Sequence, residues 1–99
     1  MTGEQRKSPR IVRLVPLLLS DDDQTVEAQS AVVSAHGALI LSPRPFVPGR
    51  GVTVTNRQTR ASIDGMVVWA GDGEPPLAFK IGVEFSRPAP EFWGEESPA

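Results

Sequence analysis

Two short segments of the sequence carry residue types that can bind phosphate and purine groups. Arg6 and Arg10 flank a Lys-Ser-Pro stretch near the N-terminus, and the planar fork of arginine can bond a phosphate or the O6/N7 edge of guanine, or stack on a purine ring. Ser34 and Gly37 form a Ser-x-x-Gly segment. A serine hydroxyl both donates and accepts hydrogen bonds, and a glycine lets the backbone approach a ligand closely or adopt positive φ. These segments are therefore candidates for a nucleotide site.

Each candidate also has a simpler interpretation. An Arg-x-x-x-Arg segment is typical of a solvated basic tail, and a Ser-x-x-Gly segment is typical of an ordinary turn at a strand end. His36, the only histidine, lies within the second segment and can contact a phosphate or a base, although a lone exposed histidine is usually inert. The consecutive carboxylates from Asp21 to Asp23 point in different directions along a strand and cannot converge on one Mg²⁺. We expect a solvated hairpin turn there and no metal site.

Composition narrows the class of protein. The chain has 99 residues, enough for one small domain with a single core. Its net charge of -2, from 10 basic and 12 acidic residues, gives no broad positive field for nucleic acid or an anionic membrane. The absence of cysteine excludes disulfides and favours a reducing cytoplasm, and no apolar run approaches the roughly 20 residues of a membrane span. With one histidine and no grouping of Ser, His and carboxylate, we expect no enzymatic activity.

The patterning predicts an all-β sandwich or barrel made of short strands separated by Pro, Gly, Asn and Asp. The clearest strand spans residues 77–86, where Phe79, Ile81, Val83 and Phe85 alternate with polar or small residues. A second strand spans residues 62–70, and its period predicts that Ile63, Val67 and Trp69 face the core, with a bulge or close backbone approach at Gly65. Residues 71–76 between the two strands are expected to form a loop.

The remaining segments predict shorter or irregular elements. Pro16 interrupts a strand over residues 11–19, which indicates an edge or a bulge. In the strand over residues 25–33, the apolar pattern changes phase between Ala28 and Ala31, which indicates a bulge or burial on both faces, and places Val32 and Ser34 outward if Val33 is inward. Residues 42–51 predict a loop, residues 52–55 a strand, and residues 88–94 a turn or one helical turn whose aromatic pair closes the barrel.

Most of the chain, from Arg6 to Gly94, resembles a stand-alone PilZ domain. The resemblance rests on the Arg-x-x-x-Arg arm, the Ser34/Gly37 segment, a Gly-Val-Thr-Val-Thr-Asn strand, Val-Val-Trp, and Gly-Val-Glu-Phe followed by Pro-Glu-Phe-Trp-Gly. It implies a six-stranded antiparallel β-barrel over residues 11–94, with a flexible N-terminal arm over residues 1–10 and a C-terminal tail over residues 95–99. It also implies a bacterial, cytoplasmic signalling domain that binds cyclic di-GMP through Arg6, Arg10, Ser34 and Gly37.

Val32 departs from the family pattern, [Asp/Asn]-x-Ser-x-x-Gly, in which an acidic or amide residue would meet the Watson–Crick edge of guanine. Valine offers only apolar contact, and loss of one base-edge contact costs on the order of 1–3 kcal/mol. The resemblance therefore implies a cyclic di-GMP effector of weakened affinity, with Val32 and His36 at the edge of its site. The alternative is a degenerate PilZ domain that binds no nucleotide and acts as an adaptor for a protein partner. In both cases we expect a monomer or weak dimer without a cofactor, a nucleic-acid partner or a membrane partner.

Overall fold

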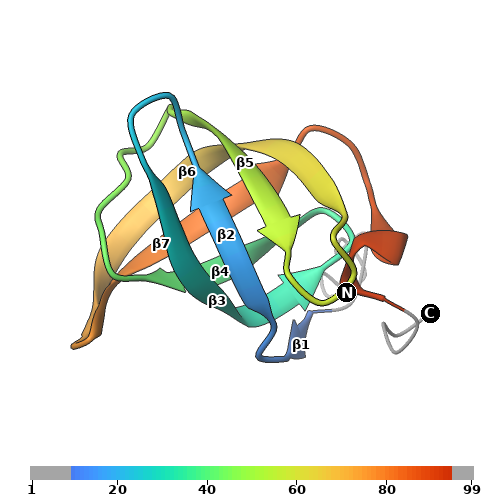
Figure 1. Ribbon diagram of the computed structural model, residues 1–99, viewed down its shortest axis with the longest axis horizontal. Coiled ribbons are helices and arrows are strands. Elements are labelled where there is room, and N and C mark those ends of the chain that lie inside the picture. The colour runs from blue at the N-terminus through green and yellow to red at the C-terminus, as the bar shows by residue number, and fades with distance from the viewer. Residues whose placement is uncertain (1–9, 95–99) are drawn as a thin grey trace, which may run out of the picture.

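The computed structural model describes residues 10–94 of the chain (Figure 1). Most of the predicted arm, including Arg6, and the predicted tail over residues 95–99 lie outside these residues, so the proposed domain boundaries remain predictions. The described chain is built of strands and one short 3-10 turn. In chain order these are β1 Ile11–Val12, β2 Pro16–Ser20, β3 Thr25–Ser34, β4 Gly37–Ser42, β5 Gly51–Asn56, β6 Ser62–Glu74, β7 Leu77–Phe85 and η2 Pro90–Trp93.

Strands β2 to β7 close into an antiparallel barrel. The order of strands around the sheet is β3-β2-β5-β6-β7-β4, and β4 returns to pair with β3, so this six-stranded ring has no open seam. Figure 1 shows the strands wrapping around one interior, with the η2 turn lying at one end. The predicted all-β barrel is therefore confirmed.

β1 and β2 are two parts of one interrupted strand that runs along the same side of β3. Ile11 and Val12 pair with Val33 and Val32, whereas Pro16 to Ser20 pair with Gln29 to Thr25. Ser30 bridges the interruption, because its buried hydroxyl donates to the Arg13 carbonyl at 2.6 Å and accepts from the Val15 N–H at 2.9 Å. The interruption predicted from Pro16 is thus present, and Pro16 begins β2.

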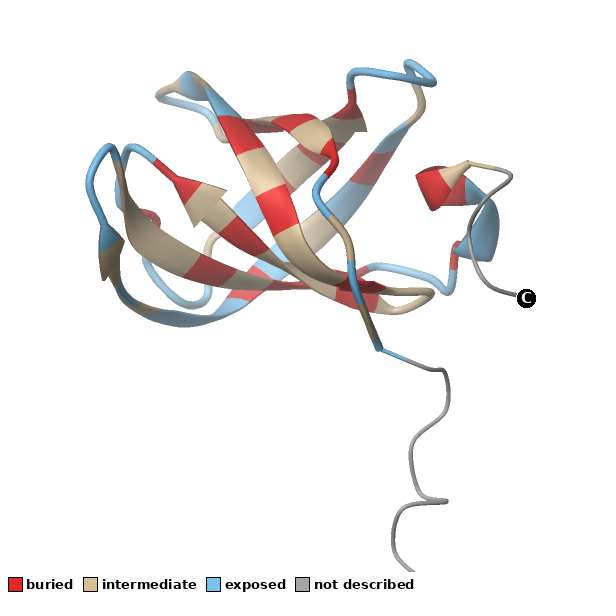
Figure 2. Ribbon diagram, turned by 90° about the horizontal axis from the view of Figure 1, so that it is seen from below, coloured by how far each residue is buried: buried red, intermediate tan, exposed pale blue. Residues whose placement is uncertain are grey.

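The barrel interior is filled by alternating residues of strands β2 to β7, seen as red bands along the ribbons in Figure 2. The predicted core residues Val67, Ile81, Val83 and Phe85 are all buried, and Phe79 is partly buried against them. Burial of these alternating side chains removes the apolar surface on which a domain of this size depends.

The prediction that Trp69 faces the core is wrong. Trp69 is 50% exposed because a bulge in β6 lies between Val67, which pairs with Val83, and Trp69, which pairs with Gly82. The extra residue, Val68, reverses which side chains face outward. The predicted close approach at Gly65 is confirmed, since a Cβ there would lie 2.7 Å from the Glu84 carbonyl oxygen.

The loop predicted over residues 71–76 is also wrong for most of its length. β6 continues to Glu74, and Gly71, Asp72 and Glu74 pair with residues of β7. Only Pro75 and Pro76 form the turn of this hairpin. Glycines interrupted the apolar pattern here, but the long partner strand supplies backbone hydrogen bonds that make extension of β6 favourable.

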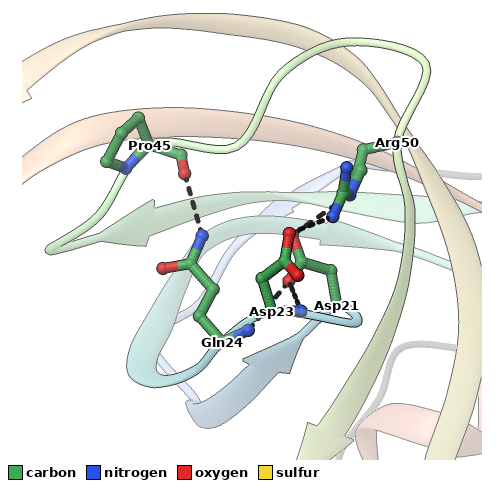
Figure 3. Close-up of polar contacts among 5 residues, drawn as sticks. All are labelled: Asp21, Asp23, Gln24, Pro45 and Arg50. Atoms are coloured by element: carbon green, nitrogen blue, oxygen red, sulfur yellow. Dashed lines mark hydrogen bonds and ion pairs between the residues drawn. The ribbon is translucent and has the colours of Figure 1, made fainter.

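Asp21 to Asp23 lie in the hairpin turn that was predicted for them, between β2 and β3, and their carboxylates stabilise it. Asp21 Oδ1 accepts from the N–H groups of Asp23 and Gln24 at 2.8 and 3.0 Å, and Arg50 contacts Asp21 and Asp23 at 3.3 and 2.7 Å (Figure 3). The Asp23 N–H, followed by the Gln24 N–H and Arg50, holds the pKa of Asp21 below its ordinary value. The charged form therefore stabilises the turn at neutral pH, and this contribution is lost as the pH falls below about 4.

The aromatic pair of η2 closes one end of the barrel, as predicted. Phe92 and Trp93 are buried and contact Phe85, with ring centroids at 5.3 and 5.9 Å. Asn56 attaches this turn to the barrel, because its fully buried Nδ2 donates to the Phe92 carbonyl at 2.8 Å. Its Oδ1 accepts from the N–H groups of Gln58 and Thr59 at 2.9 and 3.3 Å. No helix among the described residues is both long enough and apolar enough to cross a membrane.

We expect Asn56→Ala to lower the free energy of unfolding by about 2–4 kcal/mol, because it removes three hydrogen bonds and leaves buried polar groups unpaired. Urea denaturation with an unchanged m-value measures this loss. Gln58→Ala, at an exposed position of the same turn, is the control and should change stability by less than about 0.5 kcal/mol. Equal effects of the two substitutions would contradict the structural role of Asn56.

Candidate functional site

A groove of about 610 Å³ lies on the outer surface of the barrel, across β3, β4, β7 and β6. It collects every described residue that the sequence singled out for ligand binding: Arg10, Val32, Ser34, His36 and Gly37. Its volume falls within the roughly 300–1,000 Å³ typical of small-molecule sites. The sequence motifs therefore converge in space, and the groove also includes residues that they did not identify.

One wall of the groove is an apolar row that crosses the strands. Register places Val32 beside Leu39, Leu39 beside Gly82, and Gly82 beside Trp69. Val12, paired with Val32, extends the same row beyond the groove. The side of Val32 is determined by a bulge in β3 between Ser30 and Val32, which was predicted from the change of apolar phase. Val33 is buried and Val32 is half-buried on the outer face, as expected.

The other wall contains the turn between β3 and β4. Ser34 Oγ accepts a hydrogen bond from the His36 N–H at 3.2 Å, so the hydroxyl proton can still donate to a ligand. Three successive backbone carbonyls of the turn accept hydrogen bonds from the C-terminal part of the chain. The Ser34 carbonyl accepts from Trp93 Nε1 at 2.8 Å, the Ala35 carbonyl from the Ala89 N–H at 2.7 Å, and the His36 carbonyl from the Phe85 N–H at 2.8 Å. The turn is therefore shaped by the C-terminal segment before any ligand binds.

Gly37 has a structural reason for being glycine. It is buried, and a Cβ at this position would overlap the Val83 carbonyl oxygen of the adjacent strand β7. The close approach of β4 and β7 therefore requires glycine whether or not a ligand is present. Gly37 shapes the floor of the groove, and its identity alone says little about nucleotide binding.

Trp69 is the aromatic residue among the groove residues that the sequence motifs did not identify. Its indole lies along β6 over Gly71, where an added Cβ would be 2.5 Å from Cη2, and its Cβ lies 3.2 Å from a Cβ placed on Gly82. The two glycines thus make room for a large ring to lie against the outside of the sheet. Two glycines on the outer face near an aromatic residue are the signal that could have revealed this arrangement. A half-exposed indole beside polar groups offers a stacking surface for a base.

The charges around the groove are few. Arg10 is exposed at its edge, and Glu84, paired in register with Gly37, is an exposed carboxylate on its floor. A carboxylate at this position disfavours phosphates by like-charge repulsion. Among the described residues, no group of three or more His, Cys, Asp or Glu side chains is arranged to hold a metal ion.

Comparison with known proteins identifies the family. The sequence model of the PilZ family, described as a PilZ domain, matches residues 4–92. The chain belongs to the PilZ family. Members of this family are binding and effector domains, and cyclic di-GMP is the ligand associated with them.

The fold is also similar to that of a solved PilZ structure, the Bacillus subtilis inhibitor of motility MotI/DgrA. The TM-score is 0.68 at 16% sequence identity, and the match covers 85% of this PilZ domain and 44% of that chain. The domain thus spans less than half the length of MotI/DgrA, and the similarity concerns the fold. No curated protein matches the sequence significantly.

We expect Gly37→Ala to lower the free energy of unfolding by about 1–3 kcal/mol, because the new methyl group forces β4 away from β7. Thermal or urea denaturation measures this effect. Gly51→Ala is the matched control, since a Cβ at Gly51 meets nothing within 4 Å, and its stability should stay within about 0.5 kcal/mol of the parent. If Gly37→Ala were as stable as Gly51→Ala, the packing explanation of this motif glycine would be wrong.

Proposed function

We propose that this PilZ domain is an effector that binds cyclic di-GMP in the groove between the β3–β4 turn and Trp69, with weakened affinity. The observation that carries the proposal is the convergence of Arg10, Ser34 and His36 with the half-exposed indole of Trp69 in one groove. These residues come from separate parts of the chain, and the barrel brings together groups that suit phosphate, sugar and base.

Each group has a defined role in the proposed complex. The indole of Trp69 stacks on one guanine, a contact typically worth about 1–3 kcal/mol. The Ser34 hydroxyl donates to a phosphate oxygen, and Arg10 pairs with phosphate or with the O6/N7 edge of guanine. Arg6, which lies outside the described residues, joins Arg10 in the same role, since both arginines precede β1 in the family's arm pattern.

Two residues account for the weakened affinity. Val32 offers no acceptor to the N–H groups of guanine, and the apolar neighbours Leu39 and Val68 leave that part of the groove without a polar substitute. Glu84 adds a negative charge on the groove floor. One unpaired base edge costs on the order of 1–3 kcal/mol, a factor of about 5 to 150 in affinity.

A second candidate function is favoured by the apolar row itself. Val12, Val32, Leu39 and Trp69 form a stripe in which three of the residues contribute aliphatic surface and the fourth is an exposed aromatic ring. Such a stripe suits a protein partner as well as a base, and it supports the adaptor alternative. The structural neighbour MotI/DgrA is described as an inhibitor of motility.

Calorimetric titration with cyclic di-GMP, with GMP as control, tests the nucleotide proposal directly. The fluorescence of Trp69 provides a second signal, because Trp93 is 2% exposed and shielded from ligand. We expect saturable binding with quenching, and at least about a tenfold loss of affinity in Trp69→Leu and in Arg10→Ala with little loss of stability. Absence of binding at millimolar nucleotide, or unchanged affinity in both variants, would favour the adaptor function.

We expect Val32→Asp to strengthen cyclic di-GMP binding by about 5 to 150-fold, because a carboxylate can accept the hydrogen bonds of guanine that valine cannot. Val32→Asn should be measured alongside it, since the amide provides an acceptor without adding charge near the phosphates.

Val12→Asn is the matched control for this prediction. Val12 neighbours Val32 in register but does not line the groove, so its substitution should leave the affinity unchanged. Improvement by Val12→Asn equal to that of Val32→Asn, or no improvement by either Val32 variant, would exclude a specific base contact at position 32.

A further inference from the structure

β1 is an open edge on an otherwise closed barrel. Among residues 10–94, each strand from β2 to β7 pairs with at least two neighbours, whereas β1 pairs with β3 alone. No strand within the described part of the chain covers its other side, because β5, which borders β2, ends its pairing at Asn56 opposite Leu17. An unpaired strand edge presents backbone donors and acceptors that can pair with another chain.

The backbone groups of Val12 and Leu14 point toward this open side. The Arg13 N–H donates to the Ala31 carbonyl at 3.0 Å, so Arg13 faces β3 with its polar backbone. In an antiparallel pair these groups alternate sides from one residue to the next. The N–H and C=O groups of the residues before and after Arg13 therefore face away from β3.

The side chains along this edge are apolar and exposed. Val12 is 81% exposed and Leu14 is 65% exposed, the highest values among the exposed large hydrophobic residues of the described chain. Leu14 lies two residues beyond Val12, just past the end of β1, and this is the spacing at which an added strand would cover both with alternate side chains. Exposure of both the backbone and two apolar side chains distinguishes this edge from the rest of the barrel.

Positive charge around the edge favours an acidic partner segment over a second copy of the chain. Arg10 precedes β1, and the exposed residues Arg57 and Arg60 lie in the turn that begins beside Pro16, where the Arg57 N–H donates to the Pro16 carbonyl at 3.0 Å. Glu27 offsets Arg57 in part at 3.6 Å. A second copy pairing edge to edge would bring these cations together, whereas an acidic segment would neutralise them.

We propose that the edge from Arg10 to Leu14 is a docking site for an extended, acidic segment of a partner protein that adds to β1 as a further strand. Main-chain hydrogen bonds to Val12 and Leu14 give affinity, the two apolar side chains give register, and acidic residues facing Arg10 and Arg57 give selectivity. The edge shares Arg10 with the nucleotide groove, whereas neither Val12 nor Leu14, which carry the strand pairing, lines that groove.

Selection from a displayed library of random peptides about twelve residues long, against the full chain, tests the proposal. We expect enrichment of acidic peptides with alternating apolar residues. A selected peptide, synthesised and titrated into labelled protein, should shift the amide signals of Val12 and Leu14 and slow their hydrogen exchange. Its Lys-for-Glu counterpart should bind at least about tenfold more weakly.

Leu14→Pro is the decisive variant, because it removes an N–H that faces away from β3 and so blocks strand addition without removing a barrel hydrogen bond. We expect loss of peptide binding with unchanged cyclic di-GMP binding. Leu14→Glu keeps the N–H but repels an acidic peptide, and it replaces Leu14→Pro in this test if the proline variant is unstable. Peptide affinity unchanged in both variants would overturn the proposal whatever the outcome for the nucleotide.

Four other results would also overturn it. Enrichment of basic peptides, or of peptides with a helical apolar pattern, would exclude an acidic strand as the occupant. So would a selection that enriches no peptide more strongly than the same selection against the Leu14→Pro variant. A concentration-dependent dimer that Leu14→Pro abolishes would show that a second copy occupies the edge. Slow exchange of the Val12 and Leu14 amides in the peptide-free monomer would show that the chain covers the edge itself.

Discussion

Two β-bulges determine what the outer surface of this barrel presents. The bulge in β3 lies between Ser30 and Val32, and the bulge in β6 lies between Val67 and Trp69. The two bulges lie at the two ends of one row of paired residues, which runs from Val32 through Leu39 and Gly82 to Trp69. Without the extra residue in each strand, the regular alternation of side chains between the two faces would point Val32 and Trp69 into the core. The groove, its stacking surface and its apolar wall all follow from these two insertions.

The same constraint gives the groove two chemical characters. The row through Ser34, Gly37 and Glu84 is polar and backbone-rich, whereas the row through Val32, Leu39 and Trp69 is apolar. A planar purine can lie between such rows, with its face on the indole and its polar edges on the turn. An apolar protein side chain can use the second row alone. The balance between nucleotide binding and partner binding therefore depends on position 32, which belongs to the apolar row in this chain.

Local sequence patterns predicted those parts of the structure in which a strand alternates regularly. Residues 77–86 alternate without interruption, so the burial of Ile81 and Val83 followed directly. Trp69 lies in the continuous apolar run from Met66 to Ala70, where either phase fits and only pairing with β7 selects one. The extension of β6 to Glu74 also depends on its partner strand. In both cases the register of pairing between strands, which single-strand patterns do not encode, determined the structure.

The β3–β4 turn needs little rearrangement to meet a ligand. Its carbonyls are already bonded to Trp93, Ala89 and Phe85, and Asn56 holds the η2 turn that carries Trp93. A site that is shaped in advance has a lower ordering cost on binding, which then falls mainly on long side chains such as Arg10. For the same reason the turn cannot shift to replace the acceptor that Val32 lacks. Rigidity of the scaffold thus makes the chemistry of single groove residues decisive for affinity.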